Sequence, residues 1–155
     1  RRAVAALEEM HFDSPEVQSA VEGRLYLYAG ARAFLNRLFL DVREKGYEGD
    51  VVPHTGGRVE GTVVDMSLEK VQIRLPRGEL ELPLAELTPE SLLEMAQSFL
   101  ESVTDSTDYY QRQEWIAVFA RVNGLQSFSS VVAAQLMEEN REFRLRWMKV
   151  LQGGI

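Results

Sequence analysis

The sequence predicts an α+β fold, in which a small antiparallel β barrel lies between two helical segments. Between Gly57 and Leu87 hydrophobicity alternates with a period of two, which is typical of strands that bury one face. On either side of this stretch, apolar residues recur at spacings of three and four, as in amphipathic helices. We therefore divide the chain into N-terminal helices (1–46), a central β module (47–88) and a C-terminal helical array (89–155).

The alternation predicts three consecutive strands in the β module. Pro76 and Gly78 favour a turn before the third strand, because proline fixes φ and glycine accepts a positive φ. Pro83 lacks an amide hydrogen and is expected to end the third strand. The residues expected to face the core are Val59, Gly61 and Val63 in the first strand, Val71, Ile73 and Leu75 in the second, and Leu80 and Leu82 in the third.

The small number of predicted strands and the glycine inside the first of them favour a barrel. We expect Asp65, Met66 and Ser67 to connect the first two strands, and residues 47–52 to add a fourth strand. Strands this few and short are marginally stable unless the sheet curls or is covered. Gly61 lies inside an otherwise strong strand, where glycine marks a bend, a bulge or a close backbone approach. A small barrel that packs on the flanking helices satisfies both observations.

The N-terminal segment begins with the end of one predicted helix, over residues 1–10. Ser14 followed by Pro15 is a helix start, with serine as the N-cap and proline at the first helical position. The apolar spacing over residues 17–44 then predicts one long helix or two helices broken near Gly30.

The C-terminal segment repeats these start and stop signals. Thr88 and Pro89 resemble the start at Ser14, and Asn123-Gly124 is a strong C-terminal signal, as is Gly46 for the N-terminal helix. The predicted helices cover residues 89–103, 109–122, 128–137 and 141–151, with a polar connector over 104–108.

Composition narrows the function classes. The chain has 155 residues, no cysteine and a formal net charge of −7. Disulfides and thiolate metal sites are excluded, and binding to nucleic acid or anionic membranes is disfavoured because it needs a basic surface. We expect no membrane insertion, since no apolar run approaches the roughly 20 residues of a spanning helix. The chain begins with Arg1, and we interpret it as a piece of a longer protein; its composition is compatible with the cytoplasm or the periplasm.

The β module carries three short patterns of residues. They are Gly57-x-x-Glu60-Gly61-x-Val63, then Lys70-Val71-x-Ile73-x-Leu75, and then Gly78 with Leu82-Pro83-Leu84-x-x-Leu87-Thr88-Pro89-Glu90. With these patterns the module resembles the Sla-type homology domain, a small SH3-like barrel of yeast endocytic adaptors and, in divergent form, of planctomycete-type bacterial proteins. The resemblance implies an SH3-like fold, in a setting such as the regulatory extension of a serine/threonine kinase. The C-terminal helix pairs resemble tetratricopeptide-type hairpins, although generic antiparallel helices explain the same pattern.

Residues that carry chemistry have simple structural explanations in this sequence. His11 and His54 are predicted in loops, and Glu79 and Glu81 share the outer face of one strand, as alternation alone produces. We predict no catalytic residue, no cofactor and no metal site. The basic residues of the last predicted helix, interleaved with glutamates, are typical of a solvated helix face; they are Arg141, Arg144, Arg146 and Lys149.

The predicted function is a non-catalytic protein-interaction or scaffold region of a larger bacterial protein. Aromatic residues and arginine are concentrated in protein interfaces, although aromatics at helical spacing also fill cores. The candidate surface for a protein partner consists of Arg58, Arg74, Tyr109, Tyr110 and Trp115. The alternatives are an enzyme that uses surface carboxylates such as Glu79 and Glu81, and a structural spacer.

Overall fold

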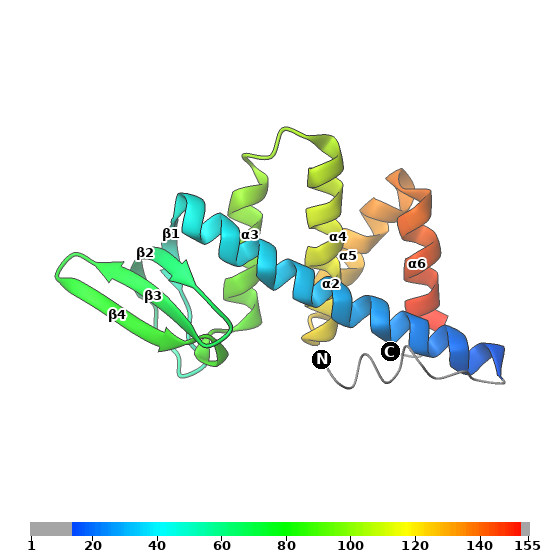
Figure 1. The fold of residues 1–155 in the computed structure, drawn as a ribbon, viewed down its shortest axis with the longest axis horizontal. Helices are drawn as coiled ribbons and strands as arrows, with labels where there is room; N and C mark the ends of the chain where they lie inside the picture. Colours follow the sequence, from blue (N-terminus) through cyan, green and yellow to red (C-terminus); the bar gives the residue numbers. More distant parts are fainter. Residues whose placement is uncertain (1–13, 153–155) are drawn as a thin grey trace. The chain divides into compact units, whose positions relative to one another are not determined.

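The computed structural model describes residues 14–152, and over this range the chain is α+β, with five α-helices, one 3-10 helix and a four-stranded antiparallel sheet (Figure 1). The helix expected over residues 1–10 lies outside the described residues. The elements are α2 (Pro15–Lys45), β1 (Tyr47–Val51), β2 (Val59–Met66), β3 (Lys70–Leu75), β4 (Gly78–Pro83), the 3-10 helix η1 (Leu84–Glu86), α3 (Pro89–Leu100), α4 (Ser106–Val122), α5 (Gln126–Glu139) and α6 (Arg141–Gln152).

The chain divides into two compact units. Among the described residues, the helical unit comprises 14–33 and 110–152, and the sheet unit comprises 34–109. The boundaries therefore fall within α2 and within α4. This division differs from the three sequence segments, because residues 34–45 of α2 and the whole of α3 belong to the same unit as the sheet.

Helix α2 begins and ends at the predicted signals. The Ser14 hydroxyl accepts a hydrogen bond from the Val17 amide at 3.5 Å and donates one to Glu16 at 2.5 Å. At the other end Gly46 has a φ of +70°, which glycine adopts without strain, and its amide donates to the Val42 carbonyl at 2.7 Å. Of the two alternatives left open by the sequence, the single continuous helix is the one observed.

Packing explains the glycine inside α2. A Cβ atom at Gly30 would lie 2.7 Å from Cγ1 of Val118, which belongs to α4 in the same helical unit. Gly30 therefore allows a close approach of two helices, and it does not break the helix that carries it. Gly23 has a similar role, since its Cβ would lie 3.3 Å from the Lys149 carbonyl oxygen in α6.

The four strands form an antiparallel meander in the order β1-β2-β3-β4 (Figure 1). This confirms the expected fourth strand near residues 47–52. Gly61 is a point of close approach, because a Cβ atom there would lie 2.7 Å from the Arg74 carbonyl oxygen. Leu80 and Leu82, expected in the core, are only half-buried in the edge strand β4.

The prediction for the end of β2 was wrong. The strand continues to Met66, which is buried, whereas the sequence placed Met66 in a polar connection. The register shifts between Val63 and Asp65, so two residues of β2 oppose one residue of β3 at this point. A bulge of this kind restarts the alternation out of phase, and Val63 and Met66 consequently both face inward. The turn follows at Ser67, whose hydroxyl accepts hydrogen bonds from the Glu69 and Lys70 amides.

The sheet is open, so the expected closed barrel is not confirmed. β1 and β4 are the two edges of the four-stranded sheet. Beyond β1, however, the chain pairs with the segment that follows η1. The Thr88 amide donates to the Val52 carbonyl at 3.1 Å, the His54 amide donates to the Glu86 carbonyl at 2.6 Å, and Pro53 and Leu87 form an antiparallel bridge.

The core of the sheet unit joins the inner sheet face with α3 and the second half of α2. The rings of Tyr47 in β1 and Phe99 in α3 meet edge to face, with 6.3 Å between their centroids. Its buried apolar residues include Leu38 and Val42 of α2, Val51, Val63, Met66, Val71 and Ile73 of the strands, and Leu92, Leu93 and Met95 of α3.

The C-terminal helices follow the predicted signals with shifted ends. Thr88 caps α3 by accepting a hydrogen bond from the Ser91 amide at 3.3 Å. α4 begins at Ser106, three residues before the predicted start, because the Asp105 carboxylate accepts from the Asp108 amide at 2.8 Å and caps the helix there. Gly124, with a φ of +79°, ends α4 as expected.

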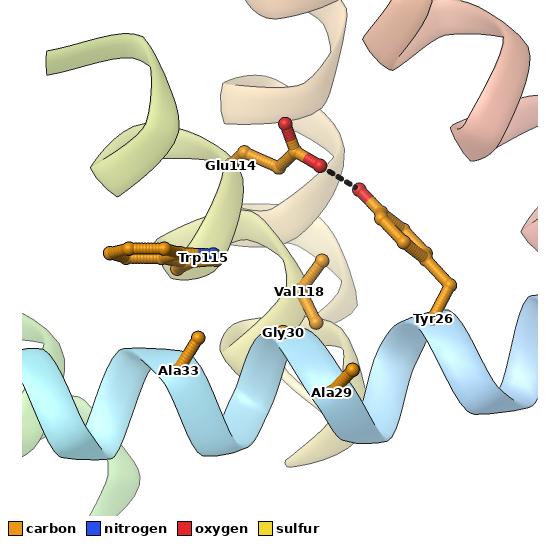
Figure 2. A pocket seen from close by; sticks show the side chains of 7 residues that line it. All are labelled: Tyr26, Ala29, Gly30, Ala33, Glu114, Trp115 and Val118. Atoms are coloured by element: carbon orange, nitrogen blue, oxygen red, sulfur yellow. Dashed lines mark hydrogen bonds between the residues drawn. The ribbon is translucent and has the colours of Figure 1, made fainter. Parts of the chain in front are cut away.

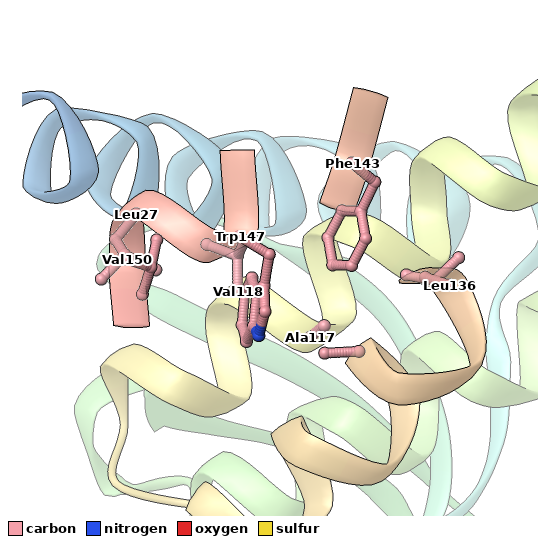
Figure 3. Packing of buried hydrophobic residues seen from close by; sticks show 8 residues of the cluster. Leu27, Ala117, Val118, Leu136, Phe143, Trp147 and Val150 are labelled. Carbon is pink, nitrogen blue, oxygen red and sulfur yellow. The ribbon is translucent and has the colours of Figure 1, made fainter. Parts of the chain in front are cut away.

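One apolar cluster holds the helical unit together. Phe143 and Trp147 of α6 stack with 5.4 Å between ring centroids, and they pack with residues of α4 and α5 (Figure 3). Trp147 is buried in this cluster. Val122, the last residue of α4, is exposed. The buried members of the cluster are Leu27, Ala117, Val118, Ala133, Leu136, Phe143, Trp147 and Val150.

Candidate functional site

A pocket of about 250 Å³ lies between α2 and α4 of the helical unit. Small residues of α2 leave the space open, because Gly30 brings the two helices together and its neighbours on that face are alanines. Figure 2 shows Trp115 near Ala33 at one end and Tyr26 hydrogen-bonded to Glu114 towards the other. The lining residues are Tyr26, Ala29, Gly30, Ala33, Glu114, Trp115 and Val118.

The polar part of the pocket is a buried carboxylate with fixed partners. The Glu114 side chain is only 9% exposed. Its Oε1 accepts hydrogen bonds from the Tyr26 hydroxyl at 2.8 Å and from Nε of Arg146 at 3.1 Å, and its Oε2 accepts from Nη2 of Arg146 at 2.8 Å. The bidentate arginine neutralises the carboxylate and fixes its orientation. Glu114 is therefore a positioned hydrogen-bond acceptor in a wall with little net charge.

The same network shifts the pKa values of its partners. Burial, together with the charge and hydrogen bond of Glu114, raises the pKa of the Tyr26 hydroxyl far above its ordinary value. Burial alone would lower the pKa of Arg146, but its hydrogen bonds and charge interactions with Glu114 and Tyr26 outweigh this and raise it. The Arg146 guanidinium also lies 6.0 Å from the centroid of the Tyr26 ring. Tyr26 stays neutral and Arg146 stays charged at ordinary pH.

A second feature of the helical unit is an apolar row on the outer side of α6. Leu145, Met148 and Leu151 recur every third residue and are 60%, 44% and 46% exposed. A helix turns by about 100° per residue, so these three side chains and those of Arg141 and Arg144 leave one side of α6. We call these five residues the α6 outer face.

The charges of the α6 outer face are not balanced locally. The Arg144 guanidinium donates to the Met137 carbonyl oxygen, a neutral acceptor. Within the part of the chain that the structure describes, Arg141 has no carboxylate at ion-pair distance. The other two basic residues of this helix differ, since Arg146 pairs with Glu114 and Lys149 pairs with Glu22 at 2.7 Å.

The predicted partner-surface residues are distributed over both units. Arg58 and Arg74 are exposed on the strands of the sheet unit, and Arg58 pairs with Asp50 at 2.9 Å. Tyr109 is half-buried at the end of the sheet unit. In the helical unit, Tyr110 packs against the apolar cluster and Trp115 lines the pocket. Their role in partner binding stays a prediction.

The carboxylates singled out from the sequence lie at the surface. Glu79 and Glu81 are both exposed on β4, and Lys70 donates to Glu81 at 2.6 Å. That hydrogen bond lowers the pKa of Glu81. Over residues 14–152, no three histidine, aspartate or glutamate side chains are grouped so as to hold a metal ion. Nor does any described helix combine the length and apolarity needed to cross a bilayer. His11 lies outside the described residues.

Sequence reasoning missed the buried network, and it assigned Arg146 to a solvated helix face, whereas the Arg146 guanidinium pairs with the buried Glu114. Tyr26, Glu114 and Arg146 come from three helices and lie far apart in the chain, so no local spacing connects them. One signal was available: the run from Trp115 to Ala120 is apolar at every position, so α4 must be covered on most sides. A charged residue next to such a run needs a partner when it is buried.

Comparisons with protein-family models, with curated proteins and with solved structures find no match to this chain.

Proposed function

We propose that this chain is a non-catalytic protein-interaction region that binds its partner through the α6 outer face. The observation that carries the proposal is the apolar row Leu145, Met148 and Leu151, exposed on a helix whose opposite side is already buried in the core. Single exposed apolar residues are common, but an ordered row on one helix side is typical of a docking surface. Helix-in-groove recognition uses anchors at this kind of spacing.

The charge of this surface defines the partner. Arg141 and Arg144 border the apolar row and have no counter-ion among the described residues. Although the chain has a formal charge of −7, the two charged residues of the α6 outer face are both arginines. Charge complementarity favours a partner helix with an apolar stripe flanked by glutamate or aspartate. We therefore assign an acidic amphipathic helix as the occupant.

A designed peptide tests this assignment. The probe is a fluorescent helical peptide with leucines along one face and glutamates beside them, and its binding is measured by anisotropy. We expect the Leu145→Ala, Met148→Ala double variant to lose about tenfold or more in affinity, because interface anchors cost more than about 1 kcal/mol each when truncated. We also expect Arg141→Glu to weaken binding and to reduce its dependence on salt.

Matched controls lie in the sheet unit. Leu68 is 72% exposed in the turn after β2, so Leu68→Ala removes an exposed leucine without touching α6. Arg77 is exposed in the turn before β4, which makes Arg77→Glu the control for charge. Both controls should bind like the wild type. Equal binding of a scrambled peptide, or unchanged binding by the double variant, would show that the α6 outer face is not the docking surface.

We also propose that the sheet unit is an SH3-like barrel of the Sla type. The antiparallel meander and the pairing of residues 52–54 with 86–88 support this, because that pairing brings the chain after β4 back beside β1. Hydrogen exchange followed by NMR checks it: the His54 and Thr88 amides should be protected as strongly as amides inside β2. Rapid exchange of both amides would favour an open sheet.

The wider setting rests on the resemblance alone. A region of a larger bacterial protein, such as an extension of a serine/threonine kinase, is consistent with the residue patterns of the β module. The complete coding sequence tests this proposal directly. A reading frame that encodes no kinase or other large domain beside this region would reject it.

A further inference from the structure

We propose that the free edge of β4 binds an extended segment of a protein partner, which adds to the sheet as a fifth, antiparallel strand with basic residues on its outer face. This surface belongs to the sheet unit and is distinct from the α6 outer face, so it adds a second docking surface to the proposed function. The proposal rests on the backbone groups that β4 leaves unpaired, on its two exposed glutamates, and on its half-buried leucines.

The two edge strands of the sheet differ in what lies beyond them. The chain beyond β1 pairs with residues 86–88, and the Val52 amide donates to the Ser91 hydroxyl at 3.1 Å. β4 is the last strand in the sheet order and lies at the margin of the sheet, so within residues 14–152 it pairs with β3 alone (Figure 1). An unpaired strand edge is a template for another strand. The sheet can therefore be extended at β4.

One hydrogen bond shows which backbone groups of β4 already have a partner. The Leu84 amide donates to the Glu69 carbonyl oxygen at 3.1 Å, one step beyond the end of the β3–β4 register. In an antiparallel pair, opposed residues alternate between those that exchange hydrogen bonds and those whose backbone groups point away. Counting back in steps of two, Leu82 and Leu80 bond to β3.

The residues between these leucines direct their backbone groups to the free edge. They are Glu79 and Glu81, and both are exposed. Their amides can donate to an added strand, and their carbonyl oxygens can accept from it. Pro83 has no amide hydrogen and ends this stretch. An added antiparallel strand therefore forms its hydrogen-bonded pairs opposite Glu79 and Glu81.

The leucines of β4 define the inner face of the added strand. Leu80 lies opposite Ile73 and Leu82 lies opposite Val71, and the two β3 residues are fully buried. The leucines themselves are only half-buried, because the sheet ends beside them. Apolar residues of an added strand would cover the leucine surface that is still exposed. The inward positions of the occupant are therefore apolar.

The glutamates of β4 define the outer face of the added strand. Among the described residues Glu79 has no ion-pair partner, and Glu81 pairs with Lys70. The cations Lys70 and Arg74 belong to β3, roughly 10 Å from an added strand, and Arg77 lies in the turn before β4. Since salt screens charges over about 8 Å, the adjacent glutamates dominate. Basic residues opposite them form favourable cross-strand pairs.

The same glutamates disfavour a second copy of this chain as the occupant. Antiparallel pairing of two β4 edges about Leu80 would place Glu79 opposite Glu81 of the second copy, and this contact would occur twice. Like charges directly opposite each other destabilise a strand pair. The glutamates thus reject self-pairing and admit a basic strand, which is how charge gives an edge its specificity.

Matched peptides test the backbone pairing. The probe is a short fluorescent peptide in which lysine alternates with valine, and its binding is measured by anisotropy. Methylation of the lysine amides removes the hydrogens that point to β4, whereas methylation of the valine amides removes hydrogens that point away from it. Both modified peptides keep the charge of the probe. We expect the first to lose about tenfold or more in affinity and the second to bind like the probe.

Charge reversal locates the site on the chain. The Glu79→Lys, Glu81→Lys double variant should bind the probe about tenfold more weakly. Glu60 is exposed on β2, two strands from the free edge, so Glu60→Lys is the matched control and should bind like the wild type. The Leu145→Ala, Met148→Ala variant should also bind the probe normally, which keeps this test independent of the α6 outer face.

Hydrogen exchange followed by NMR of the ¹⁵N-labelled protein reads the edge directly. In the free chain the Glu79 and Glu81 amides should exchange faster than the Leu80 and Leu82 amides, because only the leucine amides bond to β3. Saturation with the probe should slow the two glutamate amides and remove this alternation.

Each of the following results would overturn the proposal. Absence of saturable binding at millimolar probe would show that the edge takes no such strand. Undiminished binding of the peptide methylated at its lysines would show that no backbone pairing forms. Wild-type affinity of the folded Glu79→Lys, Glu81→Lys variant would place the peptide elsewhere on the chain. Protection of the Glu79 and Glu81 amides that rises with protein concentration, without peptide, would assign the edge to a second copy.

Discussion

The sheet unit and the helical unit each bury a carboxylate beside an arginine, Asp41 with Arg37 and Glu114 with Arg146, but in the helical unit that carboxylate also lines a pocket. In the sheet unit the strand charges pair on the outside, as in Lys70–Glu81 at 2.6 Å, and the buried strand positions are apolar. In the helical unit a carboxylate, Glu114, is buried between a tyrosine and an arginine, while Leu145 is exposed on α6. Two exceptions to the usual inside-out pattern in the helical unit, the buried Glu114 and the exposed apolar row of α6, are the candidate binding features of that unit.

This contrast indicates where function and stability are concentrated. Sequences that specify one structure are consistent across levels, and departures are expected at functional sites. The strands show one departure, the bulge in β2, and it preserves the apolar core. In the helical unit, the apolar row of α6 is exposed to solvent. The buried charge of Glu114 needs partners to offset the cost of its burial. We therefore expect variants of the sheet core to alter mainly stability, and variants of the helical unit to alter binding as well.

The largest effect is expected from the aromatic core of the helical unit. Phe143 is fully buried, and Phe143→Ala should lower the free energy of unfolding by about 3–5 kcal/mol. Ile73→Ala, at a fully buried position in the sheet, should cost about 2–5 kcal/mol. Urea denaturation followed by circular dichroism measures both. A loss below about 1 kcal/mol for Phe143→Ala would mean that α6 contributes little to the fold.

Alanine substitutions at Gly30 and Gly61 compare how the helical unit and the sheet unit can accommodate an added methyl group. Gly30→Ala should destabilise the chain by about 1–3 kcal/mol, although alanine is the better helix former, because its Cβ meets the Val118 side chain. Val118→Ala in the same chain should relieve part of that cost. A Cβ atom at Gly61 would lie 2.7 Å from both the Arg74 carbonyl oxygen and Cγ2 of Ile73, so Ile73→Ala should relieve a smaller share of the cost because the backbone contact stays. Double-mutant cycles measure both couplings, and equal couplings would contradict this distinction.

Alkaline pH should test the buried network. In the folded chain the Tyr26 pKa is raised above its ordinary 10.0, so the unfolded chain releases this proton first as pH rises. The resulting stability is complete below about pH 10 and is lost above it, by about 1.4 kcal/mol per pH unit. Tyr26→Phe removes one titrating proton, so the free energy of unfolding should fall less steeply with pH, by about 1.4 kcal/mol per pH unit. Tyr47→Phe in the sheet unit should flatten this dependence less, although burial, Glu94 and Asp50 also raise the pKa of Tyr47. Equal slopes for wild type and Tyr26→Phe would show that the hydroxyl is not held neutral.

The smallest effect is expected at the exposed pair on the sheet. Lys70→Met removes the partner of Glu81 from an ion pair at the protein surface, and the denaturation midpoint should not change measurably. The pKa of Glu81 should rise towards its ordinary value, because Lys70 lowers it in the wild type. NMR titration of the side-chain carboxyl group checks this. A clear loss of stability would mean that outer strand charges matter as much as the buried network.

Local signals predicted much of the fold. The helix caps at Ser14 and Thr88 and the stop at Gly124 depend on neighbouring residues only, and they occur where the sequence placed them. Met66 was misplaced because a bulge inserts one residue without altering composition, so the alternation alone does not reveal it. The start of α4 was placed too late because Asp105 is one of several polar residues that can act as a cap.

The candidate site was less predictable than the fold. Trp115 was selected from its residue type, and it does line the pocket, but its neighbour Glu114 was not selected. The network depends on contacts between residues of three helices that are distant in sequence, and periodicity carries no information on such contacts. Gly30 illustrates the same point: a glycine in a helix allows either a break or a close approach, and only the facing Val118 decides between them.

The bulge in β2 gives this strand a tolerance to changes in chain length. β2 carries one residue more than β3 between Val63 and Asp65, so the chain can lose Val64 and still keep Val63 and Met66 on the same face. Deletion of Thr62 would instead turn the side chains on one side of the deletion to the opposite face of the sheet. Insertions and deletions should therefore be accommodated at Val64 and rejected at Thr62, and thermal unfolding of the two deletion variants measures the difference.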